Sequence, residues 1–382
     1  MVGGLKNRGR TRGDVKERRE AVEKFTDTKL EYISSYTFDP LLAEKNIENM
    51  IGCVQVPVGF VGPLLINGEH AQGEFLIPMA TTEGALLASV NRGCSVITHA
   101  GGSNTIVVKD AMTRAPVFRV NGIKHGVDVV KWVKEHFDLV KEAAESTTRH
   151  GKLIEVRPFM VGRNLYLRFA YETGDAMGMN MATIATEEAS MLIERETGAT
   201  LVSVSGNMCV DKKPAGINSI LGRGKTVHAE VNIPRSIVDE KLHTSPEAVE
   251  EACVRKNALG SSLALSYGFN AHMANIIAAT FIATGQDAAQ VVEGSMGTTT
   301  AESLNDGLYF SVRIPALEVG TVGGGTRLPC QSEALSMLGC LGEGKAKKLA
   351  EIIASTVLAG ELSTLAAEAA GHLSSAHSEL GR

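Results

Sequence analysis

The chain has 382 residues, of which 44% are hydrophobic and 21% charged, and its formal net charge is −5 at pH 7. This length allows two or three domains, and this composition is that of an ordinary globular protein. An acidic net charge argues against general nucleic-acid binding. No apolar run approaches the ~18 residues that cross a bilayer, and no apolar segment follows the basic N-terminus. We therefore expect neither a membrane span nor a secretory signal.

The cysteines lie far apart along the chain, at positions 53, 94, 209, 253, 330 and 340. Because no two of them form a C-x-x-C pair, the sequence predicts neither a zinc knuckle nor a redox pair. We expect reduced thiols in a cytoplasmic protein, and no bound metal.

The first half of the chain predicts a small helical domain followed by an inserted domain. Residues 1–51 are charged and predict one or two helices, and residues 80–99 have helical apolar spacing. From about 105 to 207 the order of elements is β-α-β-β-α-β, as in ferredoxin-like domains. The strands are expected at 104–120, 153–161, 164–173 and 200–206, and the helices at 128–149 and 179–196. The sequence thus predicts a small inserted domain over 116–205.

The second half predicts a larger domain around this insert. A polar loop covers 206–218, and further helices and strands follow it. The fold class is therefore α+β, in which 52–115 and 219–382 together form a helix-rich domain around a mixed sheet. Its later elements are expected as strands at 227–234 and 307–322 and helices near 236–243, at 247–284 and at about 345–377.

Two common nucleotide-binding motifs are missing. There is no G-x-G-x-x-G, so a Rossmann domain is not predicted. The stretch LGRGKT at 221–226 resembles the end of a P-loop, but Ser219 stands where the first glycine should be, which makes an NTPase a poor alternative.

Five segments carry candidate chemistry. They are PMATTEGAL with Glu83, SGNMCVDKKPAGIN with two adjacent lysines, GDAMGMNM, ATGQDAAQ with Asp287, and AAGHLSSAH. Taken singly, each has an ordinary explanation, such as a first-turn carboxylate, a solvated turn or a helix cap. The lysine pair beside Asp211 could also hold an anion or a developing oxyanion.

Taken together, these segments resemble one family. With ENMIG, PVGFVGP, NRGC, DAMTR, GRGK and GTVGGGT, they match the hydroxymethylglutaryl-coenzyme A reductase family in order and spacing from Glu48 to His377. The chain resembles the class I form shared by archaea and eukaryotes more than the bacterial form. Without the membrane anchor of the eukaryotic members, it is most similar to the soluble archaeal type.

The resemblance implies the reduction of hydroxymethylglutaryl-CoA to mevalonate and CoA by two hydride transfers from NADPH. In this family pattern, Lys212 stabilises the oxyanion and Glu83 donates the proton to the nascent alcohol. Asp287 is expected between these two side chains. His377 is the implied proton donor to the CoA thiolate, because its ordinary pKa lies near neutrality.

The resemblance also implies binding residues. The substrate positions are Ser89, Asn91, Arg92, Arg114, Ser205, Asp211, Lys213, Lys256, His272 and Asn275. The cofactor positions are Thr148, Arg149, His150, Asp175, Met177, Gly178, Met179, Asn180, Gly323, Gly324 and Thr326. Arg149 could pair with a 2′-phosphate, which favours NADPH, whereas His150 replaces the aromatic residue of the family.

The implied assembly is a homodimer or homotetramer with active sites at the subunit interface, without nucleic acid or membrane as partners. Two alternatives stay open at this point. One is NAD-linked oxidation of mevalonate by the same fold, and the other is a noncatalytic CoA- or nucleotide-binding protein.

Overall fold

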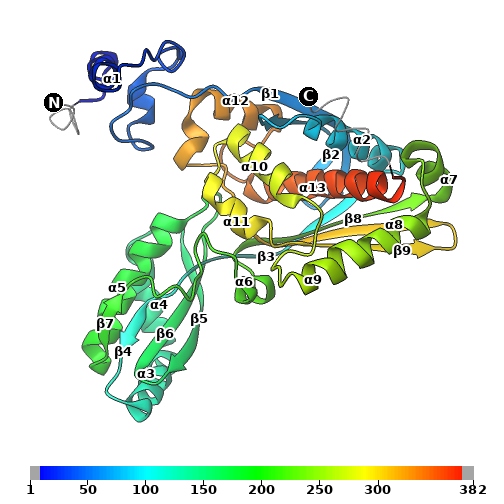
Figure 1. Cartoon of the computed structure of the whole chain (residues 1–382). Helices are drawn as coiled ribbons and strands as arrows, with labels where there is room; N and C mark the ends of the chain where they lie inside the picture. The colour runs from blue at the N-terminus through cyan, green and yellow to red at the C-terminus, as the bar shows by residue number, and fades with distance from the viewer. Residues whose placement is uncertain (1–8, 372–382) are drawn as a thin grey trace.

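A computed structural model describes residues 9–371 of the chain. Near its N-terminus, helix α1 (Arg12–Thr26) begins at a capping box in which Thr11 and Asp14 bond each other's backbone amides. The short helix η2 (Pro40–Ala43) follows. A small cluster of Val15, Ala43 and Met50 holds this segment together. Figure 1 shows it beside the main body, in blue.

The main body is built on a sheet whose central strands are antiparallel, in the order β3-β8-β10-β9. At one side of β3, strand β1 pairs with it in parallel over three residues and with β2 in antiparallel fashion. The strands are β1 (Val58–Gly68), β2 (Gln72–Ala80), β3 (Ser103–Arg114), β8 (Gly224–Pro234), β9 (Thr298–Leu304) and β10 (Gly307–Leu317).

Three helices form the core of this body against the sheet, namely α2 (Leu86–His99), α10 (Met273–Thr284) and α13 (Ala346–Ala369). Helix α13 is long and apolar enough to cross a membrane by length and composition, which corrects the expectation that no segment would be. Its most apolar window is 94% buried in the fold. Such burial is that of a core helix in a globular protein.

Shorter helices complete the main body. Their order in the chain is α6 (Gly216–Leu221), α7 (Arg235–Ile237), η3 (Val238–Leu242), α8 (Pro246–Ala252), η4 (Cys253–Gly260), α9 (Ser261–Leu263), η5 (Ala288–Gln290), α11 (Val291–Gly294), η6 (Gly324–Arg327) and α12 (Pro329–Met337).

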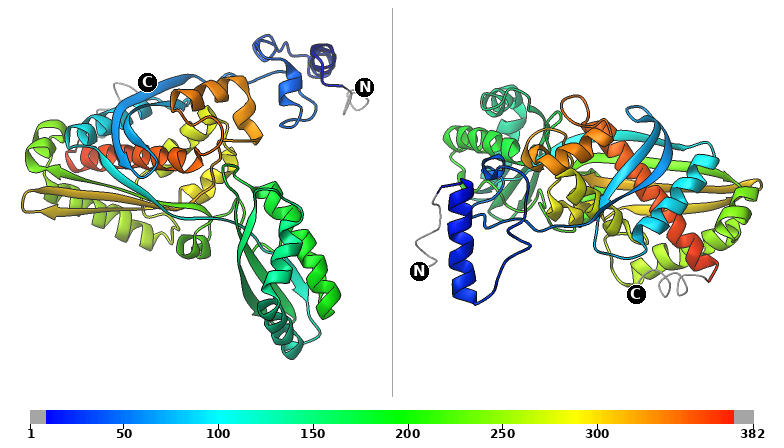
Figure 2. Two further views of the ribbon diagram at one scale, coloured as in Figure 1. Left: turned by 180° about the vertical axis from the view of Figure 1, so that it is seen from behind. Right: turned by 90° about the horizontal axis from the view of Figure 1, so that it is seen from above.

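The segment from β4 to β7 forms a second lobe, which projects from the main body in Figures 1 and 2. Its strands are antiparallel in the spatial order β7-β4-β6-β5, and its own core includes Phe118, Phe169 and Ile193. Its elements are β4 (Val117–Arg119), α3 (Ile123–Glu135), α4 (Phe137–Glu145), β5 (Lys152–Val161), β6 (Asn164–Glu172), α5 (Met179–Thr197) and β7 (Thr200–Ser203).

Strand β3 joins the two lobes. Residues Asn104 to Ala111 pair with β8 of the main body, and the last three residues of the strand, from Met112 to Arg114, pair with β6 of the second lobe. One continuous strand thus belongs to both sheets, so it fixes the lobe beside the loops that end the main-body strands.

The structure differs from the sequence prediction in several elements. The helix expected over 128–149 is two helices that meet at His136. The single helix expected over 247–284 is interrupted after Ala264, where Phe269 forms a bridge with Thr298 of β9. Strands β1, β2 and β9 and helix α12 were not predicted. The domain boundaries stay predictions.

Candidate active site

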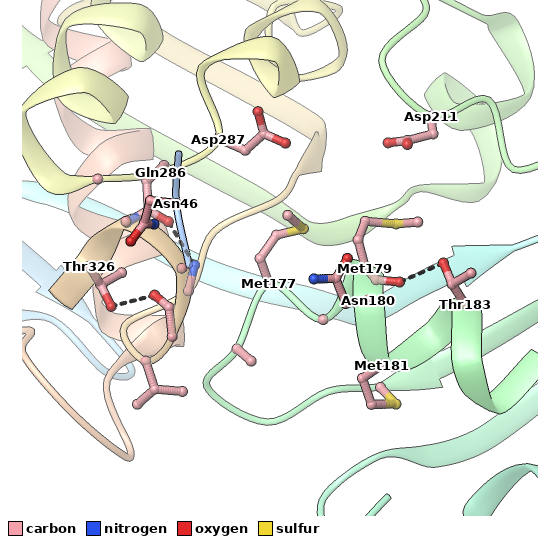
Figure 3. A pocket seen from close by; sticks show the side chains of 18 of the residues that line it. Asn46, Met177, Met179, Asn180, Met181, Thr183, Asp211, Gln286, Asp287 and Thr326 are labelled. Carbon is pink, nitrogen blue, oxygen red and sulfur yellow. Dashed lines mark hydrogen bonds between the residues drawn. The ribbon is translucent and has the colours of Figure 1, made fainter. Parts of the chain in front are cut away.

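A cavity of about 750 Å³ opens between the two lobes. In Figure 3, Asp287 and Asp211 face the same space, with Met177, Met179 and Asn180 on its second-lobe side. The lining comprises Asn46, Arg114, Ala176, Met177, Gly178, Met179, Asn180, Met181, Thr183, Asp211, Lys212, Gly285, Gln286, Asp287, Ala288, Gly320, Val322, Gly323, Gly324, Gly325 and Thr326.

One wall of the cavity is the N-terminal turn of α5. Gly178 is its N-cap, with a left-handed backbone (φ 88°), and the helix runs on for 19 residues from Met179. The free amides and the dipole at such a helix start favour an anionic ligand. This end of α5 is therefore suited to a phosphate or another anion.

A glycine-rich loop forms the opposite wall. Gly323 and Gly324 have φ values of 76° and 53°, and a Cβ added to either would meet no atom within 4 Å. Thr326 bonds back to the Gly323 carbonyl through its hydroxyl at 2.6 Å. The loop thus has a fixed turn but an open backbone surface, which a ligand can approach closely.

Asp175, also a predicted cofactor contact, has a different environment. Its carboxylate accepts backbone N–H bonds from Gly344, Lys345 and Ala346 at 2.6–3.0 Å. Burial alone would raise its pKa, but these bonds outweigh that effect and lower it. Asp175 therefore ties the second lobe to the start of α13.

Lys212 and Asp287 meet in the cavity. The Lys212 ammonium lies 2.8 Å from an Asp287 carboxylate oxygen, and this hydrogen bond raises the pKa of Lys212. Asp287 sits just beyond α10, where its carboxylate also caps the turn of η5 through the Ala289 amide. The lysine is thus held in its charged form at the surface of the cavity.

Asp211 is held by two cations beside this pair. Arg223 donates to it at 3.0 Å, Gln290 at 2.9 Å, and Arg114 lies 4.0 Å away. Burial raises the pKa of Asp211, but the Arg223 charge and the Gln290 hydrogen bond prevail and lower it. Lys213 donates to the Asp211 carbonyl at 3.2 Å, and Ser205 lies 4.0 Å from the Cys209 sulfur.

A second group of predicted residues lies at the other end of α10. Asn275 donates to the Glu83 carboxylate at 3.1 Å and approaches His272 Nδ1 at 3.4 Å. His272 Nε2 lies 2.7 Å from the Thr364 hydroxyl. The buried Glu361 accepts the His272 backbone N–H at 2.7 Å, so the main chain of this group is fixed by α13.

The remaining substrate positions line neighbouring surfaces of the main body. Ser89 and Arg92 both bond to Ser363, at 3.0 and 3.1 Å. The Asn91 side chain accepts the Gly62 amide at 2.9 Å. Lys256 pairs with Glu368 of α13.

Within one chain, the two groups do not form a single site. Asn275 lies at the beginning of α10 and Asp287 just past its end, so about 14 Å of helix separates them at 1.5 Å per residue. Among the described residues 9–371, those that line the cavity with Lys212 do not include Glu83. The described part of the chain therefore carries two separate groups of predicted residues, one with Lys212 and Asp287 and one with Glu83 and Asn275.

A turn beside the cavity carries three of the predicted cofactor contacts. The turn with Thr148, Arg149 and His150 is fixed by Thr148, whose hydroxyl accepts the Gly151 amide at 3.0 Å. A Cβ on Gly151 would lie 2.4 Å from the Met181 sulfur, so this turn adjoins the cavity lining. His377 lies outside the described residues.

The sequence prediction missed several lining and supporting residues. Asn46, Gln286 and Met181 line the cavity, and Gln286 stands beside Asp287 in the GQDAAQ segment, which could have indicated it. Arg223 belongs to the GRGK stretch, but it is fully buried. Among residues 9–371, the ligand atoms of Glu69, His70 and Glu351 lie within 4.8 Å of one another, and none of these residues lines the cavity.

Comparisons with known proteins identify the family of the chain. The family model described as hydroxymethylglutaryl-coenzyme A reductase matches residues 14–382. The chain is 56% identical over 372 residues to the 3-hydroxy-3-methylglutaryl-coenzyme A reductase of Methanocaldococcus jannaschii, covering 96% of this chain and 92% of that one. It is 58% identical over 374 residues to the enzyme of the same name from Pyrococcus horikoshii, covering 96% and 91%.

The fold is also that of a solved structure. The class II 3-hydroxy-3-methylglutaryl-CoA reductase from Streptococcus pneumoniae, bound to NADPH, superposes with a TM-score of 0.71. The match covers 92% of this chain and 96% of that one at 20% identity. With the family match over nearly its whole length and its close archaeal relatives, this chain belongs to the hydroxymethylglutaryl-coenzyme A reductase family.

Proposed function

We propose that this protein reduces hydroxymethylglutaryl-CoA to mevalonate and CoA with NADPH as the hydride donor. The observation that carries this proposal is the Lys212–Asp287 pair, 2.8 Å apart at the wall of a cavity that opens between the two lobes. A preorganised cation is what a carbonyl oxygen needs while it gains negative charge. The names of the archaeal relatives point to the same reaction.

The cavity suits a dinucleotide cofactor. The α5 N-terminus offers free amides to a phosphate, and the open backbone at Gly323 and Gly324 allows close approach. Arg149 would hold the 2′-phosphate from the adjoining turn. NADPH, when bound, supplies the hydride of each reduction step, and the related Streptococcus pneumoniae enzyme is described as bound to NADPH.

The chain's own residues would then manage charge and protons. Lys212 would stabilise the oxyanion of both reductions, and Asp287 keeps its ammonium in place. Glu83 would protonate the alcohol oxygen. His377 would protonate the departing CoA thiolate, and Arg114 and Lys213 would bind the carboxylate of the substrate.

We infer that these two groups are half-sites, which need a second copy of the chain to form one complete site. In a closed homodimer or tetramer, the Glu83–Asn275 group of one subunit would face the Lys212–Asp287 group of its partner. Exposed apolar side chains also support this arrangement. They are Ile220 on α6, Leu263 on α9 and Leu265, with 79%, 89% and 86% of their surface exposed in the single chain.

The same observations support a finer classification. The archaeal relatives share 56–58% of their residues with this chain, which favours the class I, archaeal type. All six cysteines are free, as we expect for a protein of the reducing cytoplasm. We also propose 116–205 as the cofactor domain, because this range contains the strands and helices of the second lobe.

The test is a reduction assay with product identification. Addition of hydroxymethylglutaryl-CoA to enzyme and NADPH should oxidise two NADPH per mevalonate formed, and Lys212→Ala should abolish this activity without loss of the fold. Parallel assays with NADH, and with mevalonate, NAD and CoA, measure the oxidative direction. NADPH consumption without mevalonate, or no turnover at all, would contradict the proposal.

A further inference from the structure

The loop that carries Lys212 has an unusual backbone. Three of its residues with side chains, Asn207, Val210 and Lys212, have left-handed φ values of 62°, 55° and 58°. This region is unfavourable for residues other than glycine, and most of all for a β-branched valine. Such a conformation persists only when neighbouring groups enforce it.

A buried carboxylate contacts the loop at the catalytic position itself. Glu293 on α11 is fully buried, and its Oε1 accepts the backbone N–H of Lys212 at 2.5 Å. Its Oε2 accepts the Asn218 amide at 3.1 Å. The same Asn218 amide donates to the carbonyls of Cys209 and Val210. Glu293 thus fixes the loop both directly and through Asn218.

Arg223 supplies the charge that keeps Glu293 in place. Its guanidinium is fully buried and lies 2.9 and 3.0 Å from the two Glu293 oxygens. It also contacts a second buried carboxylate, Glu318, at 3.2 Å. Burial raises the pKa of Glu318 well above its ordinary value, and the neighbouring Glu293 adds to this effect. Arg223 thus contacts both buried carboxyl groups, and its contact with Glu293 involves both carboxylate oxygens.

We propose that Glu293 is a positioning residue for the reduction, which holds the backbone of Lys212 in its left-handed conformation so that the ammonium group stays on Asp287. This inference rests on the proposed role of Lys212. Without the carboxylate, Lys212 would lose its backbone partner and the loop could relax. The ammonium would then spend less time where the oxyanion forms, and misplacement of a catalytic group by about 1 Å can cost about 10²-fold in rate.

Glu318→Gln is the matched control for Glu293→Gln. Both side chains are buried and contact the same guanidinium, but of these two carboxyl groups it is Glu293 that accepts the Lys212 backbone N–H. A glutamine at 318 also keeps the size of the side chain and an oxygen that can accept from Arg223. We expect Glu293→Gln to lower kcat by about 10- to 100-fold with little change in KM for NADPH. Glu318→Gln should keep nearly the activity of the natural chain.

A second readout does not depend on turnover. Acetylation of Lys212 by an amine-reactive ester, followed by mass spectrometry, reports how firmly its ammonium is held, and exposed Lys131 serves as the internal reference. The rate at Lys212 should rise severalfold in Glu293→Gln and stay unchanged in Glu318→Gln. If Glu293→Gln does not fold, Glu293→Asp provides the same test, because it keeps the charge but withdraws from the Lys212 amide.

The outcomes separate the two proposals. If Glu293→Gln and Glu318→Gln lower kcat equally, or if neither changes Lys212 acetylation, Glu293 has no positioning role and the inference is overturned. An active Lys212→Ala enzyme would instead refute the proposed function, while the acetylation rates would still decide the role of Glu293.

Discussion

At the scale of single residues, the cavity is organised by charges that fix one another. Lys212 is held by Asp287, and Asp211 is held by Arg223, Gln290 and Arg114. A bond to a charged group is stronger than one between neutral groups, so these contacts fix geometry as well as charge. Two predictions follow from individual side chains.

The first concerns acid stability. The pKa of Asp211 is lowered in the folded chain, so this group stabilises the fold above its unfolded pKa of about 3.8 and loses that effect as the pH falls through its folded pKa. Asp211→Asn should therefore cost about 1–3 kcal/mol at pH 7, and this cost should shrink below about pH 4. Urea unfolding at a series of pH values measures it, with exposed Asp128→Asn as the control. A cost that is constant with pH would show that the charge of Asp211 is not the cause.

The second concerns the cofactor. If Arg149 holds the 2′-phosphate, Arg149→Ala should weaken NADPH binding by about 1.5–3 kcal/mol, the value of a charge-assisted contact, and leave NADH binding nearly unchanged. Titration of each cofactor by fluorescence quenching measures both affinities. An equal loss for NADPH and NADH would mean that Arg149 supports the turn rather than the phosphate.

At the scale of elements, the core depends on close helix packing. Gly93 of α2 lies against α13 so closely that a Cβ there would be 1.9 Å from the Ala359 carbonyl oxygen. Gly93→Ala must therefore push the helices apart, and we expect a loss of about 1–3 kcal/mol or more. Thermal unfolding measures this loss. Gly122→Ala is the control, because a Cβ there meets no atom within 4 Å, and equal melting temperatures for the two variants would contradict this account of the packing.

Most elements of the second lobe could be predicted from periodicity, because its strands and helices bury one clear face each. Two elements of the main body were not predicted correctly, and each error has a physical cause. The alanine-rich tract favours a helix locally, yet Phe269 bonds with Gly297 and Thr299 beside β9, so tertiary pairing overrides propensity. Strand β1 contains Gly62 and Pro63 and a register shift, which hide its alternation.

The candidate residues could be named from the sequence because short motifs carry them. The way in which these residues group in space could not be predicted from the sequence. Glu83 and Asp287 lie at opposite ends of α10. Only the folded chain shows that Asn275 contacts Glu83 and that Lys212 contacts Asp287. The support from Glu293 was also missed, since a buried carboxylate in a short helix has no local signature.

At the scale of the whole molecule, the central claim is that two incomplete half-sites on each chain combine between subunits. One half-site carries Lys212 and Asp287, and the other carries Glu83 and Asn275. This arrangement gives a strong prediction, because a variant that inactivates one half-site leaves the other intact on the same chain.

Subunit complementation tests this claim most directly. Glu83→Gln and Lys212→Ala homo-oligomers should each be inactive. When the two variants are unfolded together, refolded as a mixture and assayed with hydroxymethylglutaryl-CoA and NADPH, mixed dimers should contain one intact composite site. Since half of randomly formed dimers are mixed, we predict roughly a quarter of the natural activity per subunit. Mixtures that stay as inactive as their parents, although mass spectrometry shows mixed oligomers, would contradict the shared site.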